Sequence, residues 1–311
     1  MTETAGMRRE RGSGRYRRAE RTVYLFMAMT EGSPMPHGMV MAGAMQEIER
    51  QGYPYELIVC PYYYNALKEK YSLFSGKYCC GAVIFGQSES DMEELEQQEF
   101  EIPVVVYNCV SGRYPSVYVD NYAGGRMAAQ LFARKGLKRV GLVSSECPNK
   151  ASALRVLGFE EGCRQAGLLL RPEHIAVCGL SEAGGQEAIH RILGFEERPE
   201  AVFVTTDGMA LGVLKELWAR GIRIPGQMEV LAFGGGALNK VAVPSLSCVF
   251  QPVEEMSAAC ISLLHMILTS GRSEQISRIF PMEIRYGDSC TAPAAVGKES
   301  GKDGVTLERD T

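Results

Sequence analysis

The chain has 311 residues, 46% hydrophobic and 23% charged, with a formal net charge of −4, which excludes disordered and fibrous proteins. No apolar run approaches the roughly 20 residues of a membrane span, and the first 22 residues lack the apolar stretch of an export signal. We therefore expect a folded cytoplasmic protein of two domains.

The chain begins with a basic segment, residues 1–22, which holds seven arginines against three glutamates. Such an arm can contact nucleic acid electrostatically, or it can be a solvated flexible tail. It contains too little apolar material to form a folded helix-turn-helix by itself.

Residues 23–107 alternate apolar runs with helical patterns, which is typical of a parallel sheet with helical crossovers. Helices are predicted at 37–51, up to about residue 76 and at 90–98. Strands are predicted at 23–29, 56–60, 81–85 and 104–107.

The next stretch, residues 117–159, carries the first polar groups placed directly after a strand. Asp120 and Asn121 follow the apolar run 117–119, and we expect Gly124-Gly125 to form a tight turn before a helix. Polar groups at the carboxyl ends of parallel strands are where open α/β folds bind small molecules.

The same alternation then repeats, and the segments 43–52 and 158–167 both place glycines nine residues apart around a charged helix. The sequence therefore predicts two Rossmann-like, doubly wound α/β lobes with a ligand cleft between them. Residues 291–311 are polar and lack periodicity, so we expect a disordered tail. The second lobe is expected to have strands at 139–143, 174–178, 201–205 and 229–233, helices near 151–165, 184–193 and 208–220, and a helix at 252–269 packed on one lobe.

Metal, cofactor and catalytic signatures are missing from this sequence. Ten cysteines occur without a CxxC pair, and four histidines are scattered without metal-ligand spacing. There is no phosphate-binding GxxxxGK[ST] loop and no GxSxG elbow, and Asp120 and Asp207 have no neighbouring nucleophile. We expect no enzyme activity, no metal and no cofactor.

Four segments together resemble the LacI/GalR family of bacterial transcription regulators, in their effector-binding domain, whose fold is that of type I periplasmic binding proteins. The resemblance covers roughly residues 22–290 in consistent order. The segments are VYVDNYAGGRMAA with KGLKRVGLV at 117–143, ALRVLGF at 153–159, AVFVTTDGMALGVLKELWARGIRIPGQMEVLAFGG at 201–235, and PSLSCVFQPVEEMSAACISLL at 244–264, with PMEIRYGDSC at 281–290 as a closing strand.

The resemblance implies a division into lobes that the chain crosses between three times. The first would comprise residues 23–138 and 251–279, and the second residues 139–250 and 280–290. Family members form homodimers, and the effector sets the spacing of two DNA-binding heads. The family's helix-turn-helix does not precede the first strand of this sequence. Either the sequence is truncated or the DNA-binding head has been lost, and in both cases DNA contact would need a head supplied from outside this chain.

The resemblance also implies ligand-binding residues. Arg155 matches an arginine that grips effector oxygens or carboxylates, although an interlobe salt bridge or a solvated position is the alternative. Asp120 matches a signature aspartate at the lobe interface, or it caps the following helix. Ser33, Asn108 and Asn149 match further positions facing the cleft.

Three positions depart from the pattern of a sugar site. Gly234 replaces an aspartate, Thr206 replaces an asparagine, and Leu180 stands where a lid aromatic stacks on sugar rings. These losses weaken the sugar hypothesis, because sugar sites combine an aromatic platform with carboxylate and amide partners. An aromatic group from residues 62–64 is a replacement candidate.

We therefore predict the effector-binding and dimerisation region of a LacI-type transcription regulator that senses a small metabolite. A DNA-independent cytoplasmic ligand-binding module is the alternative, followed by a solute-binding protein.

Overall fold

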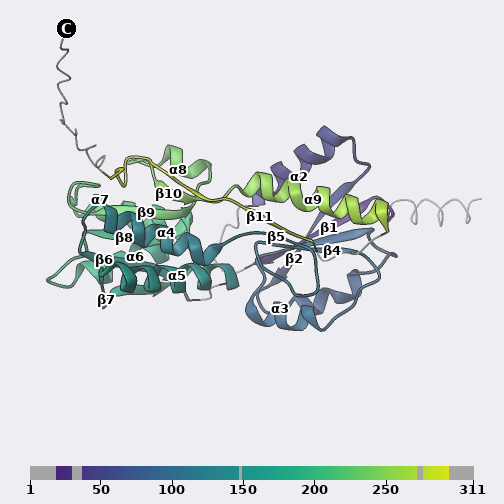
Figure 1. Cartoon of the computed structure of the whole chain (residues 1–311), viewed down its shortest axis with the longest axis horizontal. Coiled ribbons are helices and arrows are strands. Elements are labelled where there is room, and N and C mark those ends of the chain that lie inside the picture. The colour runs from purple at the N-terminus through teal and green to yellow at the C-terminus, as the bar shows by residue number, and fades with distance from the viewer. Residues whose placement is uncertain (1–18, 30–36, 147–148, 272–275, 294–311) are drawn as a thin grey trace, which may run out of the picture.

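A computed structural model describes residues 19–29, 37–146, 149–271 and 276–293 of the chain. It shows two six-stranded sheets, each with helices on both faces, set side by side as two lobes (Figure 1). Two α/β lobes were predicted from the alternating pattern, and this prediction is confirmed.

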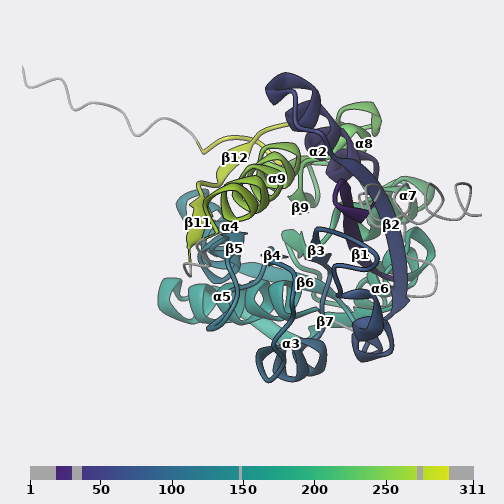
Figure 2. The ribbon, with the colours of Figure 1, turned by 90° about the vertical axis from the view of Figure 1, so that its right-hand side faces the viewer.

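The first lobe contains a fully parallel sheet in the order β11-β5-β4-β3-β1-β2. Helices α2 (His37–Gln51) and α9 (Val253–Ser270) cover one face, and η1 (Leu67–Leu73) and α3 (Glu89–Glu96) cover the other (Figure 2). Alternate strand residues face the two helix layers, as the pleat requires. The strands are β1 (Thr22–Met29), β2 (Glu56–Tyr63), β3 (Gly81–Phe85), β4 (Val104–Tyr107), β5 (Ser116–Val119) and β11 (Ser277–Phe280).

The second lobe has the order β12-β10-β9-β8-β6-β7, in which only the edge strand β12 is antiparallel. Helices α4 (Asn121–Arg134) and α5 (Lys150–Ala166) cover one face, α6 (Glu182–Leu193) and α7 (Asp207–Ala219) the other, and α8 (Ala237–Val241) follows β9. The strands are β6 (Arg139–Ser145), β7 (Leu169–Cys178), β8 (Ala201–Val204), β9 (Glu229–Gly234), β10 (Ser247–Phe250) and β12 (Glu283–Arg285).

The chain crosses between the lobes three times, from β5 to α4, from β10 to α9 and from β11 to β12. The sequence-based division assigned residues 121–138 to the first lobe, but α4 packs against α5 in the second. The physical reason for the close contact between α4 and α5 is that two residues of α4 are glycines. Added Cβ atoms at Gly124 and Gly125 would strike the Phe233 ring and the backbone of Arg155 and Phe159.

These two glycines therefore permit close helix packing inside α4, and the expected tight turn at Gly124-Gly125 is wrong. Two further differences concern element types. Strand β2 continues through the aromatic residues to Tyr63, and the helix expected up to residue 76 is a short 3₁₀ helix, η1.

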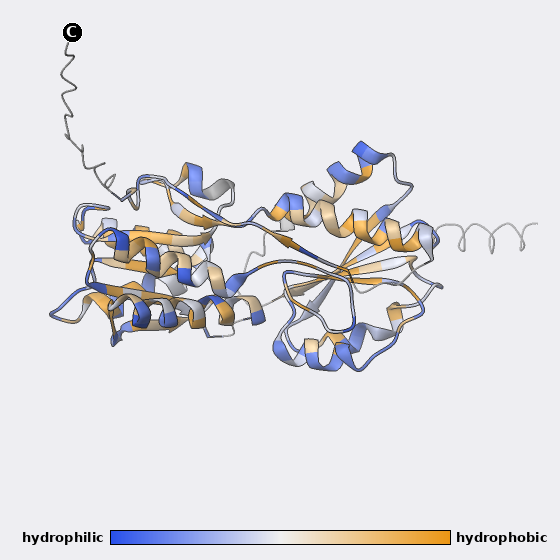
Figure 3. Ribbon diagram, viewed as in Figure 1, coloured by the Kyte–Doolittle hydropathy of each residue, from blue (hydrophilic) through white to orange (hydrophobic). Residues whose placement is uncertain are grey.

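Apolar residues concentrate in the strands and on the inner faces of the helices, while the outer helical faces are hydrophilic (Figure 3). Within the described ranges, no helix is long and apolar enough to cross a membrane. Most of the basic arm (residues 1–18), Ser33 and most of the tail (residues 294–311) lie outside the described residues.

Candidate functional site

Arg155 lies at the facing edges of the two lobes, in the second turn of α5, and is only 7% exposed. Its guanidinium donates three hydrogen bonds within the protein. Nε donates to Asn121 Oδ1 at 2.9 Å, Nη1 to the carbonyl oxygen of Thr205 at 2.9 Å, and Nη2 to Gln251 Oε1 at 3.3 Å. The guanidinium also stacks 3.6 Å from the centre of the Phe233 ring.

Two of these partners continue to the end of β4 in the first lobe. Gln251 Nε2 donates to the hydroxyl of Tyr107 at 3.1 Å, and Asn121 Nδ2 donates to Asn108 Oδ1 at 3.0 Å. Asn108 adopts a left-handed conformation with φ 54°, which asparagine tolerates better than most residues. Arg155, Asn121, Asn108, Tyr107 and Gln251 thus form a polar network between the lobes, called the interlobe network below.

The positive charge of Arg155 has only neutral hydrogen-bond partners among the residues that the structure describes. Burial lowers the pKa of Arg155 to about 9, because desolvation disfavours the charged form. The group is still charged at neutral pH. Buried charges are normally paired, so this guanidinium is suited to a ligand with oxygen acceptors, for which two of its five N–H groups remain.

Asp207 is a carboxylate whose charge acts on Arg155, and it is bound from within the second lobe. Oδ2 accepts hydrogen bonds from the backbone N–H groups of Gly235 (2.8 Å) and Gly236 (3.0 Å), and Oδ1 accepts one from Asn239 Nδ2 at 2.9 Å. Burial raises the pKa of Asp207, although these donors and Arg155 oppose the shift. The carboxylate therefore anchors the glycine loop after β9.

Three of the predicted site residues cap helices that begin at the facing edges. The side chains of Asp120, Asn149 and Thr206 accept hydrogen bonds from backbone N–H groups in the first turns of α4, α5 and α7. Asp120 was expected either to contact the ligand or to cap the following helix, and the structure shows that it caps the helix. The N-terminal ends of these three helices, which carry the positive ends of the helix dipoles, therefore lie at the facing edges of the lobes.

The other predicted residues differ in their surroundings. Asn108 belongs to the interlobe network, and Gly234 ends β9 with φ +144° beside Asp207. Leu180 is half-buried and packs against the core beneath α6 and α7. Ser33 lies outside the described residues. Of the candidate aromatics, Tyr62 is buried in the first lobe, whereas Tyr63 is 75% exposed.

Several buried side-chain oxygens near the network have no hydrogen-bond partner among the residues that the structure describes. They are Oε1 of Gln87, just after β3, Oγ of Ser152, in the first turn of α5, and Oγ1 of Thr205, just after β8. Gln87 and Thr205 touch the network directly, because Gln87 Nε2 donates to the Tyr107 carbonyl and Thr205 accepts from Arg155. Unsatisfied buried oxygens cost free energy unless a ligand or water pairs them.

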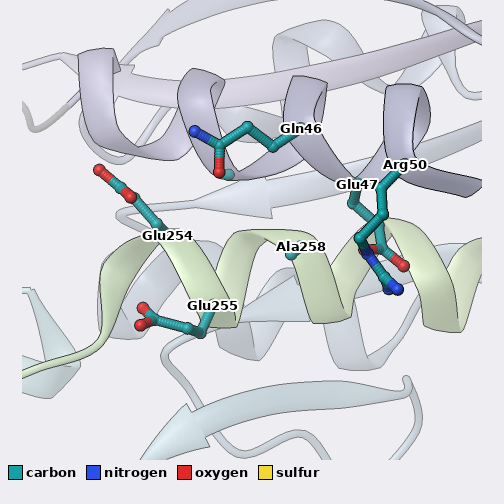
Figure 4. A pocket seen from close by; sticks show the side chains of 7 residues that line it. Gln46, Glu47, Arg50, Glu254, Glu255 and Ala258 are labelled. Carbon is teal, nitrogen blue, oxygen red and sulfur yellow. The ribbon is translucent and has the colours of Figure 1, made fainter.

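Apart from the interlobe network, a hollow of about 220 Å³ lies in the first lobe between α2 and α9 (Figure 4). Its one buried carboxylate, Glu47, already accepts hydrogen bonds from Arg50, Gln51 and Ser262. No group of histidine, cysteine or acidic side chains in the described part of the chain could hold a metal ion. The hollow is lined by Gly43, Gln46, Glu47, Arg50, Glu254, Glu255 and Ala258.

Sequence reasoning selected Arg155 and Asn108 but did not select Asn121, Tyr107 or Gln251 as site residues. Asn121 and Tyr107 lie at strand ends, which is a usable signal. Gln251 lies between a strand and a helix beside Pro252 and carried no signal of its own, because its partners are 96 and 144 residues away in the chain.

Comparison with known proteins gives a consistent result. A family model for the periplasmic binding protein-like domain matches residues 129–290. The chain is similar to catabolite control protein A from Priestia megaterium, with 28% identity over 217 residues, 68% of this chain and 65% of that protein. It is also similar to the HTH-type transcriptional repressor PurR from Serratia proteamaculans, with 24% identity over 261 residues, 81% of this chain and 76% of that protein.

Among solved structures, a LacI family transcription regulator from Clostridium acetobutylicum superposes with a TM-score of 0.80 and 29% identity. The match covers 86% of this chain and all of that one, 100%. By contrast, the chain spans just under two thirds of the length of catabolite control protein A, 65%.

Proposed function

Because the chain belongs to the periplasmic binding protein-like domain family, and within it to the LacI/GalR regulators, we propose that it binds a small-molecule effector between its lobes and thereby regulates transcription. The observation that carries this proposal is the buried, charged Arg155 at the facing edges, whose hydrogen-bond partners among the described residues are all neutral, with the unpartnered oxygens of Gln87 and Thr205 beside it. A charged group and unsatisfied oxygens in one interlobe position are the features of a ligand site.

The chemistry of this position defines the effector class. The two free N–H groups of Arg155 call for oxygen acceptors on the effector, such as a carboxylate, a phosphate or paired hydroxyls. The unpartnered amide oxygen of Gln87 can only accept, so it calls for an O–H or N–H donor on the effector, while the hydroxyls of Thr205 and Ser152 can donate or accept. The effector contacts that we propose are Arg155, Asp120, Ser33, Asn108, Asn149, Thr206, Leu180 and Gly234.

We further propose that the chain acts as a homodimer in the cytoplasm. Large apolar side chains are exposed on both lobes, including Tyr63 (75%) and Met45 (58%) on the first and Trp218 (78%) and Val243 (87%) on the second. Burial of these groups against a second copy of the chain would remove apolar surface from water, which supports the proposal. A regulator of transcription acts where the DNA is, which supports the cytoplasm.

Regulation of transcription requires a DNA-binding domain, and the PurR relative is described as an HTH-type transcriptional repressor. A DNA-independent ligand-binding module is the second candidate, because the proposed effector site uses only residues of the two lobes and the crossings between them. An enzyme is disfavoured, because the carboxylates of Asp207 and Asp120 are occupied in anchoring a loop and capping a helix.

A thermal-shift screen tests effector binding. Sugars, phosphosugars, nucleobases and small carboxylates are added to the purified chain, and a ligand at 100 times its dissociation constant raises the free energy of unfolding by about 2.7 kcal/mol. We expect a hit among compounds that carry both an oxyanion or paired hydroxyls and a hydrogen-bond donor. A screen in which no compound of these four classes shifts the unfolding temperature would contradict the proposal.

A mobility-shift assay with the promoter of its own gene separates the two candidates. Specific retardation at nanomolar protein and physiological salt supports the regulator. Failure to retard the promoter, together with a clear thermal-shift hit, favours the DNA-independent module.

A further inference from the structure

The interlobe network is a closed ring that links three parts of the fold. Arg155 comes from α5 of the second lobe, and Tyr107 and Asn108 are neighbours at the end of β4 in the first lobe. Asn121 lies on the crossing from β5 to α4, and Gln251 lies on the crossing from β10 to α9. One side chain from each of these two crossings therefore stands between the lobes.

Each crossing residue uses both ends of its amide. Asn121 accepts from Arg155 through Oδ1 and donates to Asn108 through Nδ2. Gln251 accepts from Arg155 through Oε1 and donates to Tyr107 through Nε2. The two paths from Arg155 to β4 are thus equivalent in chemistry, and neither amide can serve one lobe alone without breaking its bond to the other.

Four of the five side chains of the ring are buried, and Asn108 is half-buried, so breaking a bond in the ring costs free energy. Arg155 and Tyr107 are 7% exposed, Gln251 is 5% and Asn121 is 3% exposed. Breaking such a bond leaves a buried donor or acceptor without a partner, which weakens the closed arrangement far more than the loss of a surface hydrogen bond. The bonds from Asn121 to Asn108 and from Gln251 to Tyr107 join the two sides of this arrangement, so they are the ones that a rotation of the lobes would strain.

We propose that this ring is a clasp that restrains rotation of the lobes about the crossings, and that its weakest point is the contact between Arg155 and Gln251. That contact is the longest in the ring, at 3.3 Å, against 2.9–3.1 Å for the other three bonds. The regulatory meaning of the clasp rests on the proposed function, since an effector oxygen bound by Arg155 competes with Gln251. The clasp itself belongs to the unliganded chain.

The test is amide hydrogen exchange on the whole chain without any ligand, so failure here is separate from failure of the effector screen. Tyr107→Phe removes the hydroxyl that accepts from Gln251 and retains the ring that packs against Phe85. We expect exchange to rise about tenfold in the crossing segments, residues 119–124 and 250–256, because a buried donor loses its acceptor. Exchange in β3 and β8 should not change.

Tyr118→Phe is the matched control, because Tyr118 is on β5 of the same sheet and its hydroxyl has no hydrogen bond within the described residues. This variant should exchange as the parent does. Gln251→Glu is expected to act in the opposite direction and to slow exchange in both crossings, because it gives the buried Arg155 a carboxylate partner while the Tyr107 hydroxyl turns from acceptor to donor toward the same carboxylate.

Two outcomes would overturn the proposal. If Tyr107→Phe exchanges like Tyr118→Phe, the ring does not restrain the lobes. If exchange rises equally in β3, β8 and the crossings, Tyr107 serves overall stability and the clasp is disproved. A rise confined to the crossings in Tyr107→Phe with a fall in Gln251→Glu supports it.

Discussion

The carboxylate of Asp207 occupies the space that a side chain at Gly234 would need. A Cβ atom built on Gly234 would collide with Asp207 Oδ2 and lie 2.7 Å from Cγ. The backbone at Gly234 has φ +144°, a conformation that L-residues rarely adopt. Glycine at this position thus has a structural cause, because the loop after β9 wraps its N–H groups around a carboxylate supplied by α7.

Replacing Gly234 by alanine should therefore destabilise the second lobe. The added methyl group displaces Asp207 from its donors and imposes backbone strain, with an expected loss of about 2–4 kcal/mol in the free energy of unfolding. Urea unfolding followed by circular dichroism measures the change. Gly208→Ala is the control, because Gly208 is helical with open space around it. It should stabilise by up to about 1 kcal/mol, and equal effects of both variants would refute the explanation.

Removal of the Asp207 carboxylate should be costly for a different reason. Asp207→Ala leaves the N–H groups of Gly235 and Gly236 and the amide of Asn239 without their acceptor. We expect a loss of about 2–4 kcal/mol. Asp120→Ala is a matched comparison, since this exposed cap accepts one hydrogen bond, from Ala123, and its removal should cost about 1 kcal/mol. Thermal unfolding of both variants should rank them in this order.

Glu216 should make stability depend on pH in the acid range. Hydrogen bonds from Gln186, Arg220 and His190 lower the pKa of Glu216 to about 2. The unfolded value is about 4.3, so this stabilisation is complete above pH 4.5 or so and is lost as the pH falls toward 2. Solvent screening at the exposed partners limits it to about 1–2 kcal/mol.

The matching experiment compares the parent with Glu216→Gln by urea unfolding at pH 7 and pH 3. We expect the parent to be more stable at pH 7 and the difference to shrink at pH 3. A difference that is the same at both pH values would show that the carboxylate charge does not contribute.

The contact between α4 and α5 should depend on Gly125. An added methyl group there would strike the backbone of Arg155 and lie 2.7 Å from Phe159 N, so the two helices must separate. Gly125→Ala should cost about 1–3 kcal/mol, as overpacking does elsewhere. Gly38→Ala, in α2 with open space around it, should cost nothing. Calorimetry of the two variants measures the change in the free energy of unfolding. If Gly125→Ala leaves it unchanged, the two helices are loosely packed.

Local patterns in the sequence predicted much of the fold. Helix α2 and strands β3 and β4 have the predicted bounds, because their apolar periodicity and flanking glycine or proline act within a few residues. Gly124-Gly125 misled the prediction, since a glycine pair that permits a turn and one that permits close helix packing look identical without the partner helix.

The candidate site was predictable only in part. Arg155 was selected by resemblance, and its position at the facing edges agrees with that choice, although its role as a ligand contact stays a prediction. Gln251 could not be selected, because its partners are side chains that meet it only after both lobes have folded, whereas Tyr107 carried a signal, its place at the end of a strand, that was not used. Asp207 was considered as one of a carboxylate pair, but its donors come from a loop 28 and 29 residues further along the chain.

The geometry of Arg155 also bears on how the lobes move. Because Asn121 and Gln251 stand on different crossings and accept hydrogen bonds from the same guanidinium, a shift of Arg155 alters the bonds at both crossings together. Two of the three crossings are therefore coupled through a single side chain, and a group that displaces Arg155 is expected to loosen both of them.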